Sequence, residues 1–195
     1  MASNRSKAVF LDRDGTLIRD VGYLRRMEQL EILPGVPAAL RVLRQHGFKL
    51  VVVSNQSAVA RGWLSEKDLR KIHDALNAAL AQSGVQLDGI YYCPHHPTEG
   101  NGAYRMHCRC RKPDIGMIER ASAELGLVPE DSYVVGDQRT DLELAARIGA
   151  IAILVRGNGS AMTAGATLGA IVPDLWQAAR WIIEHDQCTE KKGVV

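Results

Sequence analysis

Short apolar runs alternate along the chain with longer stretches in which apolar residues recur every three or four positions. Five short runs have the length and the unbroken apolar character of strands that are buried on both faces. They cover residues 9–11, 49–53, 89–92, 132–135 and 151–155. The runs therefore predict strands of a sheet that is covered on both sides.

The stretches between these runs predict helices. They lie at about residues 34–47, 65–80, 113–126, 142–148 and 175–183. In the second stretch Ser65 is a candidate N-cap, with Asp68 three residues later. Pro113 suits the first turn of the third helix, because its missing N–H is not needed there.

Strands that alternate with helices predict an α/β fold, a Rossmann-like parallel sheet with helices on both faces. The order of elements predicts one domain over residues 1–187 and a frayed polar tail over residues 188–195. Residues 157–169 are rich in Gly, Ala and Thr and predict a loop. In sheets of this kind ligands bind beyond the carboxyl ends of the strands, so the residues that follow each strand are the candidate site.

Composition and charge exclude several classes of protein. The chain has 195 residues and a formal net charge of +2, too weak to indicate a nucleic-acid or membrane partner. No apolar run approaches the roughly 20 residues of a membrane span. The short polar segment before the first strand lacks the apolar region of a signal peptide, so we expect a cytoplasmic protein.

The first predicted strand ends in the sequence Asp12-Arg13-Asp14-Gly15-Thr16. Two carboxylates two positions apart at a strand end can face one pocket. Asp12 is the candidate nucleophile, since a carboxylate can attack phosphorus to form an aspartyl-phosphate. Asp14 is the candidate general acid/base for the leaving group and for water. The alternative is an Asx-rich turn that only ends the strand.

Two further strand ends offer groups for a phosphate. Ser54 and Asn55 follow the second strand, where a hydroxyl and backbone N–H groups can hold phosphate oxygens. Lys112 precedes a predicted helix and can neutralise crowded negative charge. Taken singly, a helix N-cap and a solvated surface lysine are the simpler interpretations.

The fourth strand end carries Gly136-Asp137 and, four residues on, Asp141 as an extra carboxylate. Mg²⁺ prefers oxygen ligands and often uses one or two carboxylates together with substrate phosphate. Asp12 and Asp137 with the backbone carbonyl of Asp14 are the candidate magnesium ligands. A nucleophile, an acid/base, phosphate donors, a cation and metal ligands thus all fall at strand ends, which favours chemistry over independent structural roles.

Three of the four cysteines cluster around one loop. The pattern is Cys93-Pro94-His95, then 12 residues, then Cys108-Arg109-Cys110. Three thiolates and one imidazole form a closed tetrahedral zinc shell of the structural type. In a reducing compartment such a cluster favours metal ligation over disulfides. The alternative is that buried cysteines lie beside a histidine by chance.

His96 and His107 are alternatives to His95 as the fourth zinc ligand. Zinc would pin the loop that leads into Arg111 and Lys112, and so hold two cations at the mouth of the site. Arg111 could bind a second phosphate through its planar guanidinium.

The set of strand-end motifs resembles the haloacid dehalogenase (HAD) superfamily of phosphatases over about residues 9–155. The matching motifs are Asp12 to Thr16, Ser54-Asn55, Lys112-Pro113 and Gly136-Asp137 with Asp141. The resemblance implies the nucleophile, acid/base, phosphate-binding and Mg²⁺ roles given above, in a HAD-like fold.

The zinc-like loop narrows the resemblance to D-glycero-D-manno-heptose 1,7-bisphosphate 7-phosphatases. Residues 10–16, 51–62, 88–97 and 108–117 are the most similar stretches. The resemblance implies hydrolysis of the 7-phosphate in heptose biosynthesis for lipopolysaccharide, Arg111 in contact with the sugar substrate, and a monomer without a large cap domain. The chain departs from the common pattern at Ser54, Ala58 and Gln138.

Three other functions stay open at this point. Histidinol-phosphate phosphatases are similar in motifs but have a shorter zinc loop. A broad sugar-phosphate phosphatase would share the fold. A zinc-loop binding module would need a basic or aromatic face, which a net charge of +2 and 5% aromatic residues do not favour.

Overall fold

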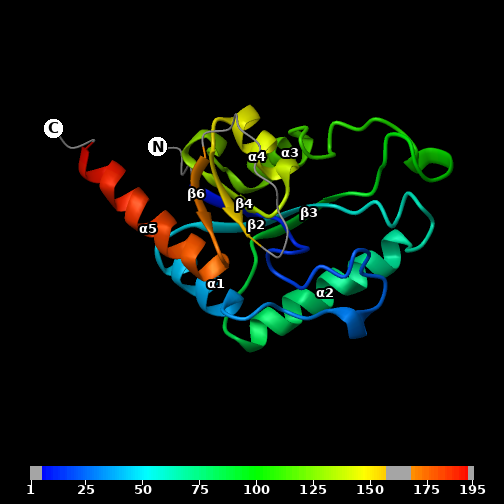
Figure 1. Ribbon diagram of the computed structural model, residues 1–195, viewed down its shortest axis with the longest axis horizontal. Coiled ribbons are helices and arrows are strands. Elements are labelled where there is room, and N and C mark those ends of the chain that lie inside the picture. Colours follow the sequence, from blue (N-terminus) through cyan, green and yellow to red (C-terminus); the bar gives the residue numbers. More distant parts are fainter. Residues whose placement is uncertain (1–5, 157–167, 193–195) are drawn as a thin grey trace.

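A computed structural model describes residues 6–156 and 168–192 (Figure 1). Six parallel strands form one sheet in the order β3-β2-β1-β4-β5-β6. The strands are β1 (Ala8–Leu11), β2 (Lys49–Asn55), β3 (Gly89–Cys93), β4 (Tyr133–Gly136), β5 (Ile151–Val155) and β6 (Leu168–Val172). This is the doubly wound strand order, and it confirms the predicted Rossmann-like sheet.

Helices cover both faces of the sheet (Figure 1). They are α1 (Val36–Gln45), α2 (Glu66–Gln82), α3 (Gly116–Leu125), α4 (Arg139–Ile148) and α5 (Leu175–Lys192). Three short 3₁₀ helices lie in connections: η1 (Met27–Gln29), η2 (Gly102–Tyr104) and η3 (Pro129–Asp131). Among the described residues, no separate cap domain is inserted between these elements. None of the described helices has the length and apolar character needed to cross a membrane.

The central strand shows why the sheet needs both layers. Val9 and Leu11 of β1 pack in a core with residues of α1, α2 and α5, whereas Ala8 and Phe10 pack in a second core with residues of α3 and α4. All four side chains are fully buried. Successive side chains of a strand point to opposite faces, so a run without polar alternation places apolar groups in both cores.

The starts of α2 and α3 differ in how well local signals in the sequence predict them. The Ser65 hydroxyl accepts a hydrogen bond from the backbone N–H of Asp68 at 3.1 Å, so the predicted cap of α2 is confirmed. The prediction for Pro113 was wrong, because α3 begins at Gly116. The backbone N–H groups of Asp114 and Gly116 bond to the carbonyls of Arg111 and Arg109 instead. Two turns therefore precede the helix.

The C-terminal part differs from the expectation in two places. Most of the predicted loop over residues 157–169 lies outside the described residues, but its last two residues begin β6. This strand was missed because it is a half-buried edge strand whose residues give no strong apolar run. Helix α5 continues to Lys192, five residues into the expected frayed tail.

The topology fixes where a ligand can bind. From β1 the chain first adds β2 and β3 on one side and then crosses to β4 on the other side. The reversal puts a crevice between the carboxyl ends of β1 and β4, which is the usual ligand site of such sheets. Asp12 follows β1 and Asp137 follows β4, so both stand at this crevice.

Candidate active site

A buried lysine joins two carboxylates at the centre of the site. The Lys112 Nζ donates to Asp12 Oδ1 at 2.5 Å, to Asp141 Oδ1 at 2.6 Å and to the Val53 carbonyl at 2.8 Å. Burial alone would lower the pKa of Lys112, but the two carboxylates outweigh it and raise that pKa. Burial raises the pKa of Asp12 to about 7, with Lys112 opposing the shift and Asp141 adding to it. Lys112 is therefore a fixed cation beside the candidate nucleophile.

Three carboxylates can hold a cation. Asp12, Asp137 and Asp141 each place an oxygen within 4.8 Å of the others, and all three side chains are buried. Burial raises the pKa of Asp137 to about 6. A Cβ on Gly15 would lie 2.4 Å from Asp137 Oδ2, so the close approach of the two strand-end loops requires glycine there. One lysine cannot balance three carboxylates, and the oxygen donor set suits Mg²⁺.

The second aspartate of the β1 loop is held by a different set of groups. Arg13 donates to both oxygens of Asp14 at 2.8–3.1 Å. The Gln56 amide donates to Asp14 Oδ2 at 2.9 Å and to Ser54 Oγ at 2.6 Å. The Asp14 carboxylate is therefore turned towards Arg13 and Gln56, and it is not part of the three-carboxylate group. Its predicted part in Mg²⁺ binding rests on its backbone carbonyl.

The β2 end is tied to the lysine. The Asn55 side chain donates to the Lys112 carbonyl and accepts from the Lys112 N–H, both at 3.0 Å. Both polar atoms of the Asn55 amide thus position the Lys112 backbone. Ser54, which is 1% exposed, lies one residue earlier and accepts from Gln56.

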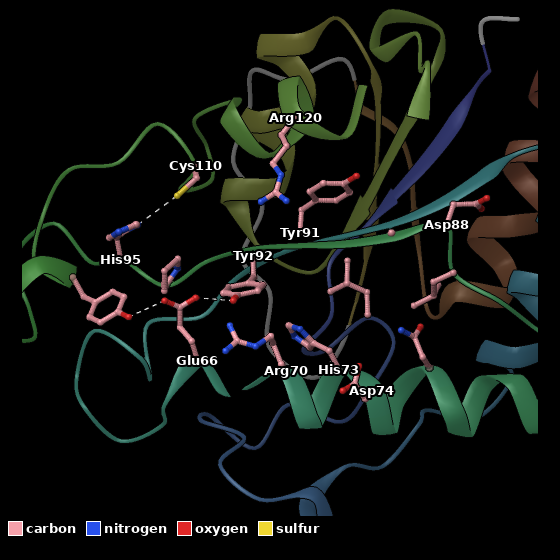
Figure 2. Close-up of a pocket in the computed structure, with 16 residues that line it drawn as sticks. Glu66, Arg70, His73, Asp74, Asp88, Tyr91, Tyr92, His95, Cys110 and Arg120 are labelled. Atoms are coloured by element: carbon pink, nitrogen blue, oxygen red, sulfur yellow. Dashed lines mark hydrogen bonds between the residues drawn. The ribbon is translucent and has the colours of Figure 1, made fainter. Parts of the chain in front are cut away.

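The predicted zinc ligands converge. Cys93, His95, Cys108 and Cys110 place their donor atoms within 4.8 Å of one another. The Cys110 Sγ lies 3.0 Å from Cys93 Sγ, 2.7 Å from Cys108 Sγ and 3.5 Å from His95 Nδ1. Figure 2 shows the His95 ring directed towards Cys110. Three thiols and an imidazole that face one point form the donor set of a structural zinc site.

The alternative histidine His96 has a different role here. Its Nδ1 accepts hydrogen bonds from the backbone N–H groups of Thr98 and Glu99. Arg111, which follows the cluster, donates to the His95 carbonyl at 3.0 Å. The Cys/His cluster therefore fixes the segment that carries Arg111 and leads into Lys112.

The structure thus brings most of the predicted site residues together. Asp12, Asp14, Ser54, Asn55, Lys112 and Asp137 lie at the carboxyl ends of β1, β2 and β4 or in contact with residues there. Arg111 directly precedes Lys112 in the chain and so lies next to this group. The four predicted zinc ligands form a separate cluster.

Three residues of the network were not predicted from the sequence. They are Arg13, Gln56 and His73. Only His73 could have been found from the sequence, because it is a polar residue at a position on the buried apolar face of α2. Arg13 and Gln56 lie next to predicted site residues in the chain, and no pattern around them in the sequence indicates that they are buried. Asp141, noted only as an extra carboxylate, is a direct partner of Lys112.

Several known proteins are similar to this chain in sequence. Residues 109–178 match a family model described as HAD-hydrolase-like. The D-glycero-β-D-manno-heptose-1,7-bisphosphate 7-phosphatase of Haemophilus ducreyi is 45% identical over 81% of this chain and 87% of the relative. The enzyme of that name from Escherichia coli K12 is 40% identical over 90% of this chain and 87% of the relative.

A solved structure is similar as well. It is the D,D-heptose 1,7-bisphosphate phosphatase of B. bronchiseptica in complex with magnesium and phosphate. The two chains are 34% identical and superpose with a TM-score of 0.79 over 92% of this chain and 99% of the other. The fold is therefore a HAD-like α/β fold.

Proposed function

The chain belongs to the D-glycero-β-D-manno-heptose-1,7-bisphosphate 7-phosphatase family, and we propose that it removes the 7-phosphate of that sugar through an aspartyl-phosphate on Asp12. It is accordingly a phosphoric monoester hydrolase. The observation that carries the mechanism is the buried Lys112, which bridges Asp12 and Asp141 at the crevice between β1 and β4.

In the first step an oxygen of Asp12 bonds to phosphorus while the bond from phosphorus to the sugar oxygen breaks. Asp14 gives its proton to the departing oxygen. Lys112 and the Ser54 hydroxyl bind the equatorial phosphate oxygens. The main contribution of these residues is positioning and charge stabilisation, as expected for phosphoryl transfer.

In the second step water attacks the aspartyl-phosphate. Asp14, now ionised, takes a proton from that water, and the oxygen of the water bonds to phosphorus. The bond to Asp12 breaks, inorganic phosphate leaves, and both carboxyl groups return to their starting state. One residue thus serves first as acid and then as base.

Magnesium is the proposed catalytic cation, held by Asp12, Asp137 and the Asp14 carbonyl, with Asp141 close by. When bound, it would offset the negative charge of the carboxylates and the phosphate. Three buried carboxylates with one lysine support this assignment. The magnesium and phosphate bound to the B. bronchiseptica relative support it too.

Zinc is the proposed structural ion of the loop over residues 93–110. The convergence of Cys93, His95, Cys108 and Cys110 supports it. A closed shell of four protein ligands leaves no position for a substrate, so the ion would stabilise the loop that carries Arg111. Arg111 and Asn55 remain proposed substrate contacts, in which Asn55 acts partly through Lys112.

Other expectations stay predictions. We propose that residues 1–187 form one phosphatase domain and that the protein acts as a monomer in the cytoplasm. We further propose that its product enters the synthesis of nucleotide-activated heptose and lipopolysaccharide precursors. The names of the relatives support the sugar substrate, and they favour the β-anomer.

The Asp12→Asn variant tests the mechanism. We expect no release of phosphate from the bisphosphate, because the amide nitrogen and oxygen of Asn are poor nucleophiles, and an unchanged far-UV circular dichroism spectrum, because Asn has nearly the same shape as Asp. Asp131→Asn is the matched control, since Asp131 is exposed in η3. Normal turnover by a folded Asp12→Asn variant would refute the aspartyl-phosphate mechanism.

A further inference from the structure

The largest charged side chain in the core is not used by the mechanism above. Arg13 is 1% exposed, although it lies between the candidate nucleophile Asp12 and the candidate acid/base Asp14. A guanidinium stays charged inside a protein, so its burial is costly unless each face of it is paired. The hydrogen-bond partners of Arg13 therefore indicate its role in the site.

Three side chains surround the guanidinium. Asp14 accepts at 2.8–3.1 Å, Gln56 Oε1 accepts from Nη2 at 2.9 Å, and His73 Nε2 lies 3.2 Å from Nη1. Gln56 also donates to Asp14, so the arginine and the glutamine hold the same carboxylate from two sides. Of these groups only Asp14 has a task in the chemistry described above.

His73 lies on the far side of the arginine from Asp14. It comes from α2 and faces a pocket of about 810 Å³ between α2, β3 and the zinc loop, with the Tyr92 ring 5.4 Å from its own (Figure 2). Asp12, Asp14 and Lys112 do not line this pocket. His73 therefore stands between the pocket and the network that holds the acid/base.

The protonation state of His73 is fixed by its surroundings. Since Arg13 can only donate, His73 Nε2 accepts, and the ring carries its proton on Nδ1. Burial, and then the charge of Arg13, lower the pKa of His73 to about 3. The ring is a neutral acceptor that fixes one arm of the guanidinium fork.

We infer that Arg13, supported by His73, is a positioning residue that holds Asp14 in place for its acid/base work. Arg13 acts through Asp14, and His73 acts through Arg13. The inference rests on the proposed function, in which Asp14 protonates the leaving sugar oxygen.

The test compares leaving groups. A sugar oxygen leaves poorly without a proton, so its departure depends on Asp14. The p-nitrophenolate ion leaves without one. The kcat/KM value covers the reaction up to the first irreversible step, so it does not contain the later hydrolysis of the aspartyl-phosphate. A displaced Asp14 lowers kcat/KM for the sugar ester and spares kcat/KM for the aryl ester, whereas general damage to the site lowers both.

His73→Leu removes the acceptor and leaves the backbone of α2 intact, so it avoids the folding risk of an Arg13 variant. We expect kcat/KM for heptose 1,7-bisphosphate to fall by about 10- to 100-fold, the size of a small misplacement of a catalytic group. The value for p-nitrophenyl phosphate stays near that of the unaltered protein. His73→Gln keeps an acceptor and restores most of the loss. Asn77→Ala, one turn further along α2 in the same pocket, is the matched control and leaves both values unchanged.

Parallel loss of both kcat/KM values in His73→Leu, or no loss of either, would overturn the inference. Failure of the proposed function can be distinguished from failure of the inference about Arg13 and His73. If the unaltered protein hydrolyses p-nitrophenyl phosphate but not the bisphosphate, the substrate assignment is wrong. The same comparison is then made with the alkyl phosphate that the protein hydrolyses fastest, and the inference is decided on that pair.

Discussion

Replacing Lys112 by methionine should destabilise the fold as well as stop catalysis. The Nζ is 2.5 and 2.6 Å from the oxygens of Asp12 and Asp141, and the lysine is 3% exposed. At an effective dielectric constant of about 20, each contact contributes about 6–7 kcal/mol of attraction, most of which offsets the desolvation of the charges. Removing one partner leaves the two carboxylates buried without a cation, and this costs about 3–5 kcal/mol.

The measurement is urea unfolding of magnesium-free protein at pH 7 and pH 5. In Lys112→Met the deficit should be smaller at pH 5, because burial raises the pKa of Asp12 to about 7, so this carboxyl group can then take up a proton and lose its charge. Lys71→Met is the matched control, since Lys71 makes an exposed ion pair with Asp68 and should have little effect at either pH. A loss in Lys112→Met no greater than in the control, or equal at both pH values, would refute the reasoning.

Three further predictions follow from the site. In magnesium-free protein the pKa values of Asp12 and Asp137 are raised to about 7 and about 6, so the stability that these two groups contribute is full below about pH 4 and is lost as pH rises through these values. Mg²⁺ should therefore raise Tm more at pH 8 than at pH 5. An equal rise at both pH values would contradict this. Gly15→Ala places a Cβ against Asp137 at a backbone φ of +78°, so it should weaken Mg²⁺ binding by titration calorimetry at least tenfold, whereas Gly84→Ala, also at positive φ but in open space, should not. Cys108→Ala should abolish bound zinc by elemental analysis and expose the loop to proteolysis, while Cys188→Ala should keep the metal; zinc retained in Cys108→Ala would remove the assigned site.

The strands that are buried on both faces could be predicted from the sequence, because this burial is visible in the apolar character of the strand's own residues. A strand covered on both faces is apolar along its buried length, and β1, β5 and residues 50–53 of β2 show this in the sequence alone. The edge strand β6 is only half-buried and begins in a segment rich in glycine and alanine, so its pairing with β5 decides its structure. Propensity is a weak guide where tertiary pairing decides.

The part of the candidate site that lies directly after predicted strands could also be predicted from the sequence. Asp12, Ser54 and Asp137 follow from their place at the carboxyl ends of a parallel sheet. Contacts between side chains far apart in sequence do not follow from such positions. Arg13 meets His73 across 60 positions, and nothing near Arg13 in the chain shows that it is buried. An arginine beside two aspartates is expected at the surface, and only the packing of α2 against the β1 loop overrides that expectation.

The most direct test of the central claim is release of phosphate from heptose 1,7-bisphosphate, in both anomers, beside histidinol phosphate and with or without Mg²⁺. We predict release that requires Mg²⁺, prefers the β-anomer of the bisphosphate and is slow with histidinol phosphate. Preference for histidinol phosphate would keep the HAD-like fold and the aspartyl-phosphate mechanism but contradict the proposed substrate. Absence of magnesium-dependent release from every one of these esters would contradict the phosphatase assignment itself.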